Sequence, residues 1–508
     1  MIGLPFLQDH AVLPRDAPLR FGGQAAPGKR VTVTIADASG TTEADSEGRW
    51  VIELPPFPAG VGFEASVDLE GIQTFRDICF GDLWLCAGQS NMDMTLEATE
   101  NGPAEASAAR DSLIREWRVT RRLSYHPSSE ISGGWHRCDS EAASTASAIG
   151  YYFAKGLRKD LKVPIGIIRS TWGSTIIASW ISRETLMAQT CARQEFDRWW
   201  EQARREPDLG NRFSHLFGEW QADMVQHRIE VERPYAETLQ RAIQNSEIPP
   251  PPPMNLPQGV GSPRTPGAIY NAMIAPLFAL PLRGVLWYQG ESDTWTESST
   301  FAYRAANYET LLKALIESWR KGWGQKVLPF IVVQLSSFDS RIPETADTGW
   351  AAIRNAQAAA GRIPYVAVVP TFDVREPYEL HPHQKSFVGE RASRVALEIS
   401  YGRMMDAQAP RFARAVFGMD RVEVFIETAS GLRPMSRHLA PSFQASTEGS
   451  SYFSTEVEVG QSSIVCFSPR NKPVTSIRYA WADNPDCTVI GKNGLPLLPF
   501  SINKPPVQ

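Results

Sequence analysis

The sequence predicts an α/β protein in which a parallel β-sheet, covered by helices on both faces, is flanked by β-rich segments at both ends of the chain. Three features support this fold class. β-branched runs separated by turn residues fill the first 75 residues, apolar strands alternate with helical segments from about residue 76 to 405, and alternating apolar and polar residues return after 406. Strands that alternate with helices pack as a parallel sheet between helical layers.

The first segment, residues 1–75, is expected to form a small β-sandwich. The runs VTVTI at residues 31–35 and WVIEL at residues 50–54 favour strands. Turn clusters, DASG at 37–40 and SEG at 46–48, separate such runs. Short strands with this punctuation are typical of an all-β unit.

The central segment supplies the predicted parallel sheet in two parts, residues 76–185 and 265–405. Its apolar strands are expected at residues 83–87, 164–168, 283–288 and 328–334. Three of them lead into polar clusters: GQSN at 88–91, STWGS at 170–174 and QGES at 289–292. Because the carboxyl ends of parallel strands meet at one edge, where α/β sheets bind ligands, we expect a functional site there.

Two further segments complete the expected organisation. Residues 186–264 are predicted to be an insertion, helical and charged at first, with five consecutive prolines at 249–253 that favour an extended spacer. Residues 406–508 are predicted to be a closing β domain, because runs such as VEVFI at 422–426 alternate in the manner of a strand.

Composition argues against several classes of protein. The net charge of −5 and the lack of a long Lys/Arg run give no sign of the basic surface that binds nucleic acid. No apolar stretch approaches the ~18–20 residues that span a bilayer, so no membrane is expected as a partner. No signal peptide is visible, which predicts a cytoplasmic protein, or a periplasmic or secreted one if a leader has been removed. The oligomeric state is not predicted.

The cysteines predict neither a zinc site nor a disulfide framework. They are scattered and include no CxxC pair, so we interpret them as buried free thiols and expect no metal. The six are Cys79, Cys86, Cys138, Cys191, Cys466 and Cys487.

Ser90 is the candidate nucleophile. It lies in a GQSN turn directly after an apolar strand, which could expose its hydroxyl at the top of the sheet and direct its own N–H at a bound carbonyl group. A serine hydroxyl needs a base to become nucleophilic and donors to hold the oxyanion that forms. The turn is not the GxSxG elbow of α/β-hydrolases, and an ordinary turn serine is the alternative interpretation.

The candidate base is His381, which lies between a strand at 366–369 and a helix at 384–399. A histidine there can reach over the sheet to Ser90, with an adjacent carboxylate to fix its tautomer. His383 competes for this role. His381 precedes a proline that restrains its backbone, whereas His383 has the character of a surface residue at the start of the helix, so we predict His381.

Three more residues belong to the same predicted edge. Gln289 can donate its side-chain amide to an oxyanion, and Gly173 can offer a backbone N–H. Glu291 has the character of a structural carboxylate that buttresses the loop, so we place it behind the reacting groups.

Three blocks of the sequence stand out together: GQSNM at 88–92, WYQGES at 287–292 and HP at 381–382. They resemble blocks of the sialate O-acetylesterase family, which belongs to the SGNH superfamily of flavodoxin-like hydrolases. The likeness runs nearly end to end and includes FLQDHAVL at 6–13, VPIGII at 163–168, WG at 172–173, YNAMIAPL at 270–277 and RYAWADNP at 478–485.

The resemblance implies a flavodoxin-like SGNH hydrolase core that removes acetyl esters from a carbohydrate without a metal or other cofactor. The expected partner is an acetylated oligosaccharide, from sialic acid or from a plant cell-wall polymer such as xylan or xyloglucan. Ser90 is implied as nucleophile and His381 as base. The backbone of Ser90, Gly173 and the amide of Gln289 are implied as the oxyanion hole.

The third member of the triad departs from the superfamily pattern. The usual Asp three residues before the histidine is here Tyr378, and Glu379, two residues before it, stands where the family commonly has Asp. We predict that Glu379 orients His381, with Asp373 as the alternative and a dyad as the third possibility.

Two other functions compete with this reading. One is a carbohydrate-binding or scaffold protein with a degenerate hydrolase core, and the joint presence of the candidate site residues argues against it. The other is a general short-chain arylesterase or a lipase-like enzyme. The absence of a long apolar lid argues against the lipase-like form.

Overall fold

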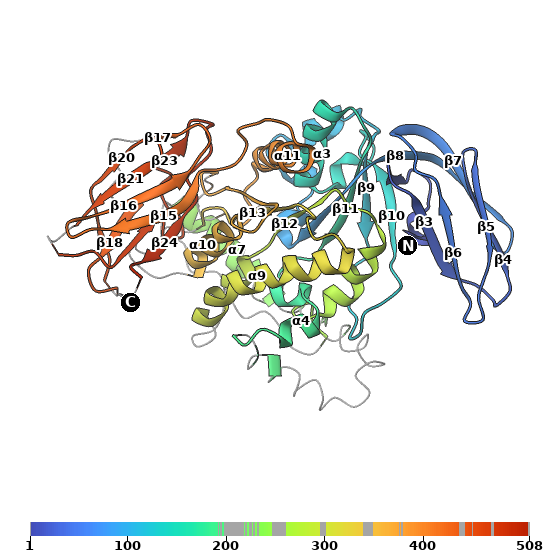
Figure 1. Ribbon diagram of the computed structural model, residues 1–508, viewed down its shortest axis with the longest axis horizontal. Helices are drawn as coiled ribbons and strands as arrows, with labels where there is room; N and C mark the ends of the chain where they lie inside the picture. Colours follow the sequence, from blue (N-terminus) through green and yellow to red (C-terminus); the bar gives the residue numbers. More distant parts are fainter. Residues whose placement is uncertain are drawn as a thin grey trace.

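The computed structural model of this chain describes residues 2–191, 193, 196–197, 218, 221–222, 226, 229–230, 233–245, 261–294, 301–338, 349–374, 376, 379–435, 442–449, 451–468 and 472–505. Figure 1 shows three parts in a row, with N-terminal strands at one end, a core of strands and helices in the middle and C-terminal strands at the other end. The chain is a mixed α/β protein with a mostly parallel central sheet and extra β-rich regions, as predicted.

The N-terminal strands form two small sheets, one of β1, β3 and β6 and the other built on β4, β5 and β7. Along β6 every second side chain is buried, namely Trp50, Ile52 and Leu54, as expected for a strand with one face toward a core. The strands are β1 (Ile2–Gly3), β2 (Val12–Pro14), β3 (Leu19–Gln24), β4 (Arg30–Ile35), β5 (Ala38–Glu43), β6 (Arg49–Leu54) and β7 (Gly60–Asp68), with the short helix η1 (Leu4–Phe6).

The long strand β8 (Ile72–Gly88) joins the second of these sheets to the core. Its first half pairs antiparallel with β7, and its second half pairs parallel with β11 (Ile165–Thr171) and β12 (Gly284–Tyr288). Residues 78–88 are all buried, because this half is covered on both faces. The boundary expected at residue 75 therefore falls inside one continuous strand.

The central sheet has the strand order β10-β9-β11-β8-β12-β13-β14. Only β10 runs antiparallel to its neighbour, β9. Without these two strands the order along the chain is 2-1-3-4-5, in which the first strand, β8, lies beside the third, β12. Sheets of this order bind ligands at that switch point. The remaining strands are β9 (Ile114–Val119), β10 (Gly133–Arg137), β13 (Phe330–Val333) and β14 (Val366–Val369).

Helices cover both faces of the sheet (Figure 1). On one face, α3 (Ala148–Leu161) packs against α11 (Lys385–Tyr401); α9 (Phe301–Trp323) and α10 (Gly349–Ala360) lie on the other. Gly389 lets α11 approach α3 closely, because a Cβ there would lie 2.5 Å from the Cβ of Tyr152. The shorter helices are α1 (Ser90–Asp93), η2 (Leu96–Ala98), α2 (Gly102–Ala108), η3 (Ala143–Thr145), η4 (Ile177–Trp180), η6 (Tyr270–Ile274), η7 (Ala275–Ala279) and α8 (Glu291–Thr294).

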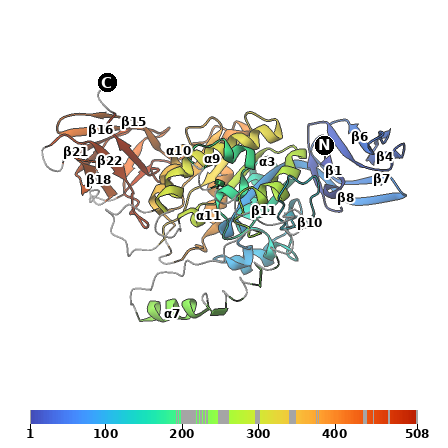
Figure 2. The ribbon, with the colours of Figure 1, turned by 90° about the horizontal axis from the view of Figure 1, so that it is seen from below.

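Only part of the insertion predicted at residues 186–264 is described. α4 (Arg183–Met187) leads into it, and α7 (Arg233–Gln244) lies apart from the core in Figure 2. The proline run at 249–253 lies outside the described residues.

The C-terminal strands have a second apolar core, to which Phe372 also contributes from the loop after β14. Arg354 of α10 ties this part to the sheet, because its buried guanidinium donates to the carbonyl oxygens of Ser336 (3.2 Å) and Asp483 (3.0 Å). The strands are β15 (Arg411–Phe417), β16 (Arg421–Glu427), β17 (Leu432–Pro434), β18 (Phe443–Ser446), β19 (Phe453–Ser454), β20 (Val457–Val459), β21 (Ser463–Phe467), β22 (Ser476–Tyr479), β23 (Val489–Gly491) and β24 (Phe500–Asn503).

All six cysteines are free thiols, and four of them, Cys79, Cys86, Cys138 and Cys466, are buried. Cys191 and Cys487 are partly exposed. Within the described ranges, no helix has the length and apolar character needed to cross a membrane.

Candidate active site

The carboxyl ends of β8, β11 and β12 lie in register. Gly88, the last residue of β8, pairs with Thr171 and with Tyr288. Its φ is 138°, and a Cβ there would lie 2.0 Å from the carbonyl oxygen of Tyr288, so only glycine fits. Gln89 donates its backbone N–H to that same oxygen at 3.1 Å. α1 then begins at Ser90, which places this residue at the edge of the sheet.

Ser90 and His381 meet at this edge. His381 lies in the loop between β14 and α11, and its Nε2 is 2.7 Å from Ser90 Oγ, a hydrogen-bond distance. Ser90 itself is partly exposed. The structure thus brings together the residues predicted as nucleophile and base.

The imidazole of His381 is held in its neutral form. Burial, with smaller effects of the positive charges of Lys385 and His383, lowers its pKa from 6.5 to about 4. A neutral imidazole is the form that accepts a proton, so His381 is available as a base above this pH.

The competing histidine, His383, is engaged elsewhere. Its Nδ1 lies 2.7 Å from Glu376 Oε2, and its side chain is 48% exposed. Its backbone N–H donates to the other oxygen of that carboxylate at 2.6 Å. His383 is therefore a surface residue paired with Glu376.

Glu379 does not occupy the position predicted for a triad carboxylate. Its Oε1 accepts a hydrogen bond from the backbone N–H of His381 at 2.8 Å, and within the described residues this carboxylate makes no hydrogen bond to the ring. The physical reason is the spacing, because a carboxylate two residues away closes a local hydrogen bond to the backbone more readily than it reaches Nδ1.

Asp373, the alternative, is also engaged elsewhere. Arg391 holds its two carboxylate oxygens at 2.8 and 2.6 Å. Among the residues that the structure describes, His381 Nδ1 has no hydrogen-bond partner. Within the described residues, the arrangement is a Ser–His pair. Tyr378, at the usual position of the aspartate, lies outside the described residues.

Two backbone N–H groups are available beside Ser90. Gly173 lies against it, because a Cβ on Gly173 would be 3.5 Å from Ser90 Cβ and 4.0 Å from Ser90 N. In the described part of the chain, neither the N–H of Ser90 nor that of Gly173 has an acceptor. Unpaired donors next to a nucleophile are what an oxyanion requires.

Gln289 is placed differently from the prediction. Its Nε2 donates to Gln89 Oε1 (3.1 Å), the carbonyl of Thr175 (2.9 Å) and Asp293 Oδ2 (2.6 Å), and its Oε1 accepts from the hydroxyl of Tyr308 (2.9 Å). Three acceptors already share its two amide protons. An oxyanion role for Gln289 would require the amide to leave one of these partners.

Glu291, predicted to lie behind the reacting groups, contacts the residue that follows Ser90. It is buried and accepts a hydrogen bond from the side-chain amide of Asn91. Burial raises its pKa, although the hydrogen bond from Asn91 and the charge of Lys385 oppose this. Sequence reasoning did not single out Asn91 or Lys385. The available signals were that Asn91 follows the nucleophile and Lys385 begins the helix after the base.

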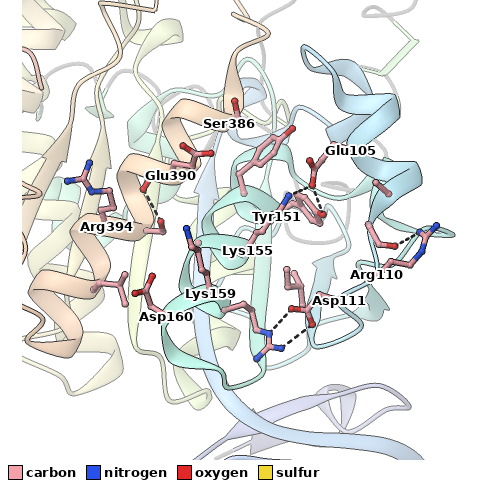
Figure 3. A pocket seen from close by; sticks show the side chains of 18 of the residues that line it. Glu105, Arg110, Asp111, Tyr151, Lys155, Lys159, Asp160, Ser386, Glu390 and Arg394 are labelled. Atoms are coloured by element: carbon pink, nitrogen blue, oxygen red, sulfur yellow. Dashed lines mark hydrogen bonds and ion pairs between the residues drawn. The ribbon is translucent and has the colours of Figure 1, made fainter. Parts of the chain in front are cut away.

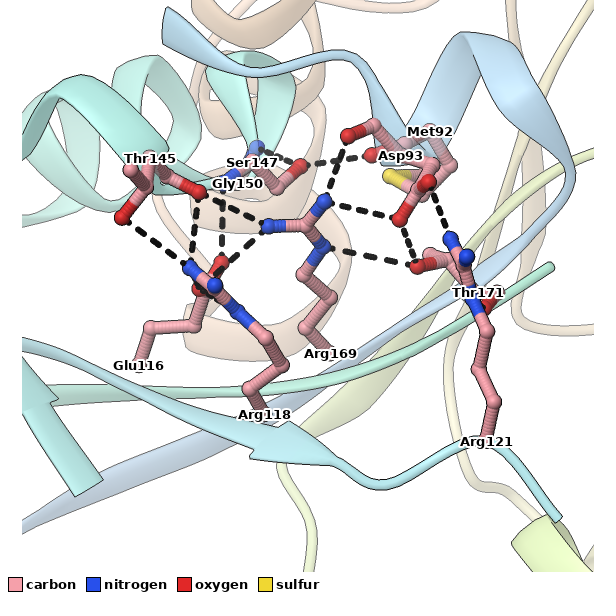
Figure 4. Close-up of polar contacts among 10 residues, drawn as sticks. All are labelled: Met92, Asp93, Glu116, Arg118, Arg121, Thr145, Ser147, Gly150, Arg169 and Thr171. Atoms are coloured by element: carbon pink, nitrogen blue, oxygen red, sulfur yellow. Dashed lines mark hydrogen bonds and ion pairs between the residues drawn. The ribbon is translucent and has the colours of Figure 1, made fainter. Parts of the chain in front are cut away.

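An arginine-rich cavity of 580 Å³ lies beside α1, and Figure 4 shows its polar contacts. Asp93, the last residue of α1, pairs with Arg169 (2.7 Å) and Arg121 (2.5 Å). Burial raises the pKa of Asp93, but these two guanidinium groups outweigh it and hold the pKa below its usual value. Arg118 on the same side pairs with Glu116 at 3.1 Å.

A large cavity in the described part of the chain does not contain Ser90. It has a volume of 1020 Å³ and lies between α3 and α11, where Tyr151, Lys155 and Glu390 line it (Figure 3). Its size therefore does not mark the candidate active site.

The family comparison points to an esterase. Residues 263–397 match the family model described as "Carbohydrate esterase, sialic acid-specific acetylesterase". The mouse (Mus musculus) sialate O-acetylesterase is 28% identical over 417 residues, which cover 75% of this chain and 70% of the mouse protein. The human (Homo sapiens) sialate O-acetylesterase is 29% identical over 418 residues, which cover 75% of this chain and 67% of the human protein.

A solved structure is similar over nearly the whole chain. It is that of a carbohydrate acetylesterase from Xanthomonas citri, with a TM-score of 0.78 and 26% identity, covering 98% of this chain and 99% of that one. Together with the family match, this likeness confirms the resemblance predicted from the sequence.

Proposed function

We propose that this carboxylic ester hydrolase of the sialate O-acetylesterase family removes O-acetyl groups from a carbohydrate through an acetyl-serine intermediate. The observation that carries the proposal is the distance of 2.7 Å between Ser90 Oγ and His381 Nε2. A serine hydroxyl that donates to a neutral imidazole can transfer its proton as it attacks a carbonyl carbon.

In the first half of the reaction, Ser90 Oγ attacks the acetyl carbonyl carbon while His381 Nε2 takes the hydroxyl proton. The carbonyl oxygen becomes an oxyanion, which the backbone N–H groups of Ser90 and Gly173 stabilise. The carbon–oxygen bond to the sugar then breaks, and His381 gives its proton to the departing alcohol. Acetyl-Ser90 is left on the enzyme.

In the second half, water attacks the acetyl group on Ser90, and His381 takes a proton from that water. The same two N–H groups hold the second oxyanion. Its collapse breaks the ester bond, releases acetic acid, which then ionises to acetate in solution, and returns the proton from His381 to Ser90 Oγ. Atoms and charges balance with the residues of this chain and one water molecule.

The core that presents these groups is proposed to be a flavodoxin-like SGNH hydrolase core. The order β11-β8-β12-β13-β14, with Ser90 after the first of these strands in the chain, supports this. The proposed divisions of the chain are those expected from the sequence: 1–75, 76–185, 186–264, 265–405 and 406–508. The continuous strand β8 crosses the first of them.

The arginine-rich cavity bears on the identity of the sugar. In the described part of the chain, Nη1 of Arg118 and Nη1 of Arg121 have no hydrogen-bond partner. Guanidinium groups bind carboxylates well. We therefore place an acetylated sialic acid, which is an acidic sugar, first among the candidate substrates, and a neutral cell-wall oligosaccharide second.

Acetate release tests this order of substrates. kcat/KM for 9-O-acetyl sialic acid should exceed that for acetylated xylo- or xyloglucan oligosaccharides, and Arg118→Gln should lower only the first. A preference for the neutral oligosaccharides that Arg118→Gln does not change would place them first among the candidate substrates. The proposal of acetylesterase activity would not be affected.

The activity itself is tested with chromogenic esters of increasing acyl length. The proposal predicts that an acetyl ester is hydrolysed faster than a butyryl or longer one. Faster turnover of the longer esters would favour a lipase-like role. Saturable sugar binding without hydrolysis of any ester would favour the scaffold alternative.

A further inference from the structure

The two residues on either side of His381 are each held by a buried side chain. Asn91 Nδ2 donates to the carbonyl oxygen of Leu380 at 3.0 Å. Lys385 Nζ donates to the carbonyl oxygen of Pro382 at 2.6 Å. The peptide carbonyls before and after the candidate base are therefore fixed from the core side.

Asn91 and Lys385 also bind each other. Lys385 Nζ donates to Asn91 Oδ1 at 2.6 Å and lies 5.9 Å from the centre of the Tyr288 ring. The second contact of Asn91 Nδ2 goes to Glu291 Oε1. Asn91, Lys385 and Glu291 are each at most 2% exposed. They form one buried unit that runs from the residue after Ser90 to the loop of His381.

This unit carries an electrostatic cost. Burial lowers the pKa of Lys385 to about 7 even though Glu291, Glu376 and Glu379 favour its charged form. Glu291 Oε2 is buried and has no hydrogen-bond partner among the described residues. Apolar side chains would be cheaper to bury here. Costly polar groups of this kind are typical of functional sites.

We propose that Lys385 and Asn91, supported by Glu291, are positioning residues that hold His381 within reach of Ser90 through the carbonyl groups of Leu380 and Pro382. The inference rests on the proposed function of Ser90 and His381. It explains how a histidine whose Nδ1 meets no carboxylate, within the described residues, can keep a productive orientation. In a triad, that task falls to an acidic side chain.

Lys385 also has an electrostatic effect on the base. Its charge and that of His383 lower the pKa of His381, as burial does. The carboxylates around the loop have hydrogen-bond partners other than the His381 ring. Glu379 accepts from the backbone of His381, Glu376 binds His383 and Glu291 binds Asn91. Removal of the Lys385 charge should therefore let His381 take up a proton at a higher pH.

The experiment compares three variants in the full-length enzyme with a chromogenic acetyl ester. Lys385→Met removes both the donor and the charge, and Asn91→Leu removes the hydrogen bonds but keeps the charge. Arg391→Met is the matched control, because it deletes an ion pair from the same helix without touching residues 380–382. kcat, KM and the pH dependence of kcat/KM are measured, and thermal unfolding is followed alongside.

Lys385→Met should lower kcat by about 10²-fold, the effect of a small misplacement of a catalytic group, with little change in KM. Its acid limb in kcat/KM should move to higher pH. Asn91→Leu should show a similar loss of kcat, but the acid side of its pH profile of kcat/KM should stay where it is in the wild type. Arg391→Met should resemble the wild type in both respects. If Lys385→Met does not fold, the comparison of Asn91→Leu with Arg391→Met decides the matter.

The inference fails if folded Lys385→Met and Asn91→Leu keep wild-type kcat, or if their losses merely follow loss of thermal stability and Arg391→Met shows the same. Either result would leave the proposed function intact as long as Ser90→Ala is inactive. A fully active Ser90→Ala would instead refute the proposed function itself.

Discussion

The carboxylate of Glu379 holds the backbone N–H of His381 at 2.8 Å, and the imidazole ring of that histidine reaches Ser90 without a carboxylate behind it among the described residues. An acidic residue next to a catalytic histidine is usually expected to orient its ring. Here the acidic residue orients the chain instead. The distinction changes what each substitution in this loop should do.

Glu379→Gln should lower kcat by less than about threefold, because a glutamine oxygen can accept the same backbone hydrogen bond. Asp373→Asn should also be mild, since Asp373 binds Arg391 and not the histidine. Where a carboxylate supports the histidine of a triad, its amide replacement costs about 10⁴-fold. A loss of that size in either variant, measured under identical conditions, would restore a triad.

The two histidines of the loop should differ sharply. His381→Ala should approach the inactivity of a variant without the nucleophile, about 10⁴-fold or more below wild type. His383→Ala should be mild, because its ring binds Glu376 at the surface. Steady-state kinetics of both variants on one acetyl ester check this. An active His381→Ala beside an inactive His383→Ala would exchange their roles.

The pH dependence of kcat/KM follows from the low pKa of His381. The base must be neutral, and its pKa is about 4, so activity should hold as the pH falls below 6.5 and decline only near 4. The free energy of unfolding should also fall as the pH falls. The unfolded chain binds a proton at His381 between these values and the folded chain does not, so this group lowers stability as the pH falls through that window. An acid limb near 6.5 would contradict the burial of the histidine.

Gln289 should act on stability more than on chemistry. Gln289→Ala removes the buried hydrogen bonds to Gln89, Asp293 and Tyr308, and each lost hydrogen bond costs about 0.5–1.5 kcal/mol, or more where the partner is charged. We expect a marked fall in the denaturation midpoint with a loss in kcat of less than about tenfold. Loss of an oxyanion donor would instead cost about 10²–10³ in kcat with the stability unchanged. Urea unfolding and kinetics on the same preparation separate the two outcomes.

Features that depend on a local pattern of residues could be predicted from the sequence. The buried half of β8, the turn at Gly88 and the alternation of β6 are each written in a short run of residues, so strands and nucleophile could be predicted together. His381 could be predicted from its place between a strand and a helix, and the family blocks pointed to the same residue. What the sequence could not supply were contacts between distant segments, such as Lys385 with Asn91, which lie 294 positions apart. Nothing in the local pattern marks such a lysine as buried.

Glu379 and Gln289 also show that a short motif does not specify the hydrogen-bond partners of its residues. Both residues have the chemistry that the predicted role requires, and both lie in the predicted region. Their hydrogen-bond partners depend on the backbone path at His381 and on the packing of Tyr308 against the strand end, which no short motif specifies.

The most direct test of the central claim is the turnover of an acetyl ester by purified, folded Ser90→Ala beside the wild type. We expect that the wild type hydrolyses the ester and that kcat of the variant is lower by about 10⁴–10⁶-fold, with an unchanged thermal unfolding midpoint. A folded Ser90→Ala that keeps a tenth or more of wild-type kcat, about 10³- to 10⁵-fold above that expectation, would contradict the assignment of Ser90 as the nucleophile.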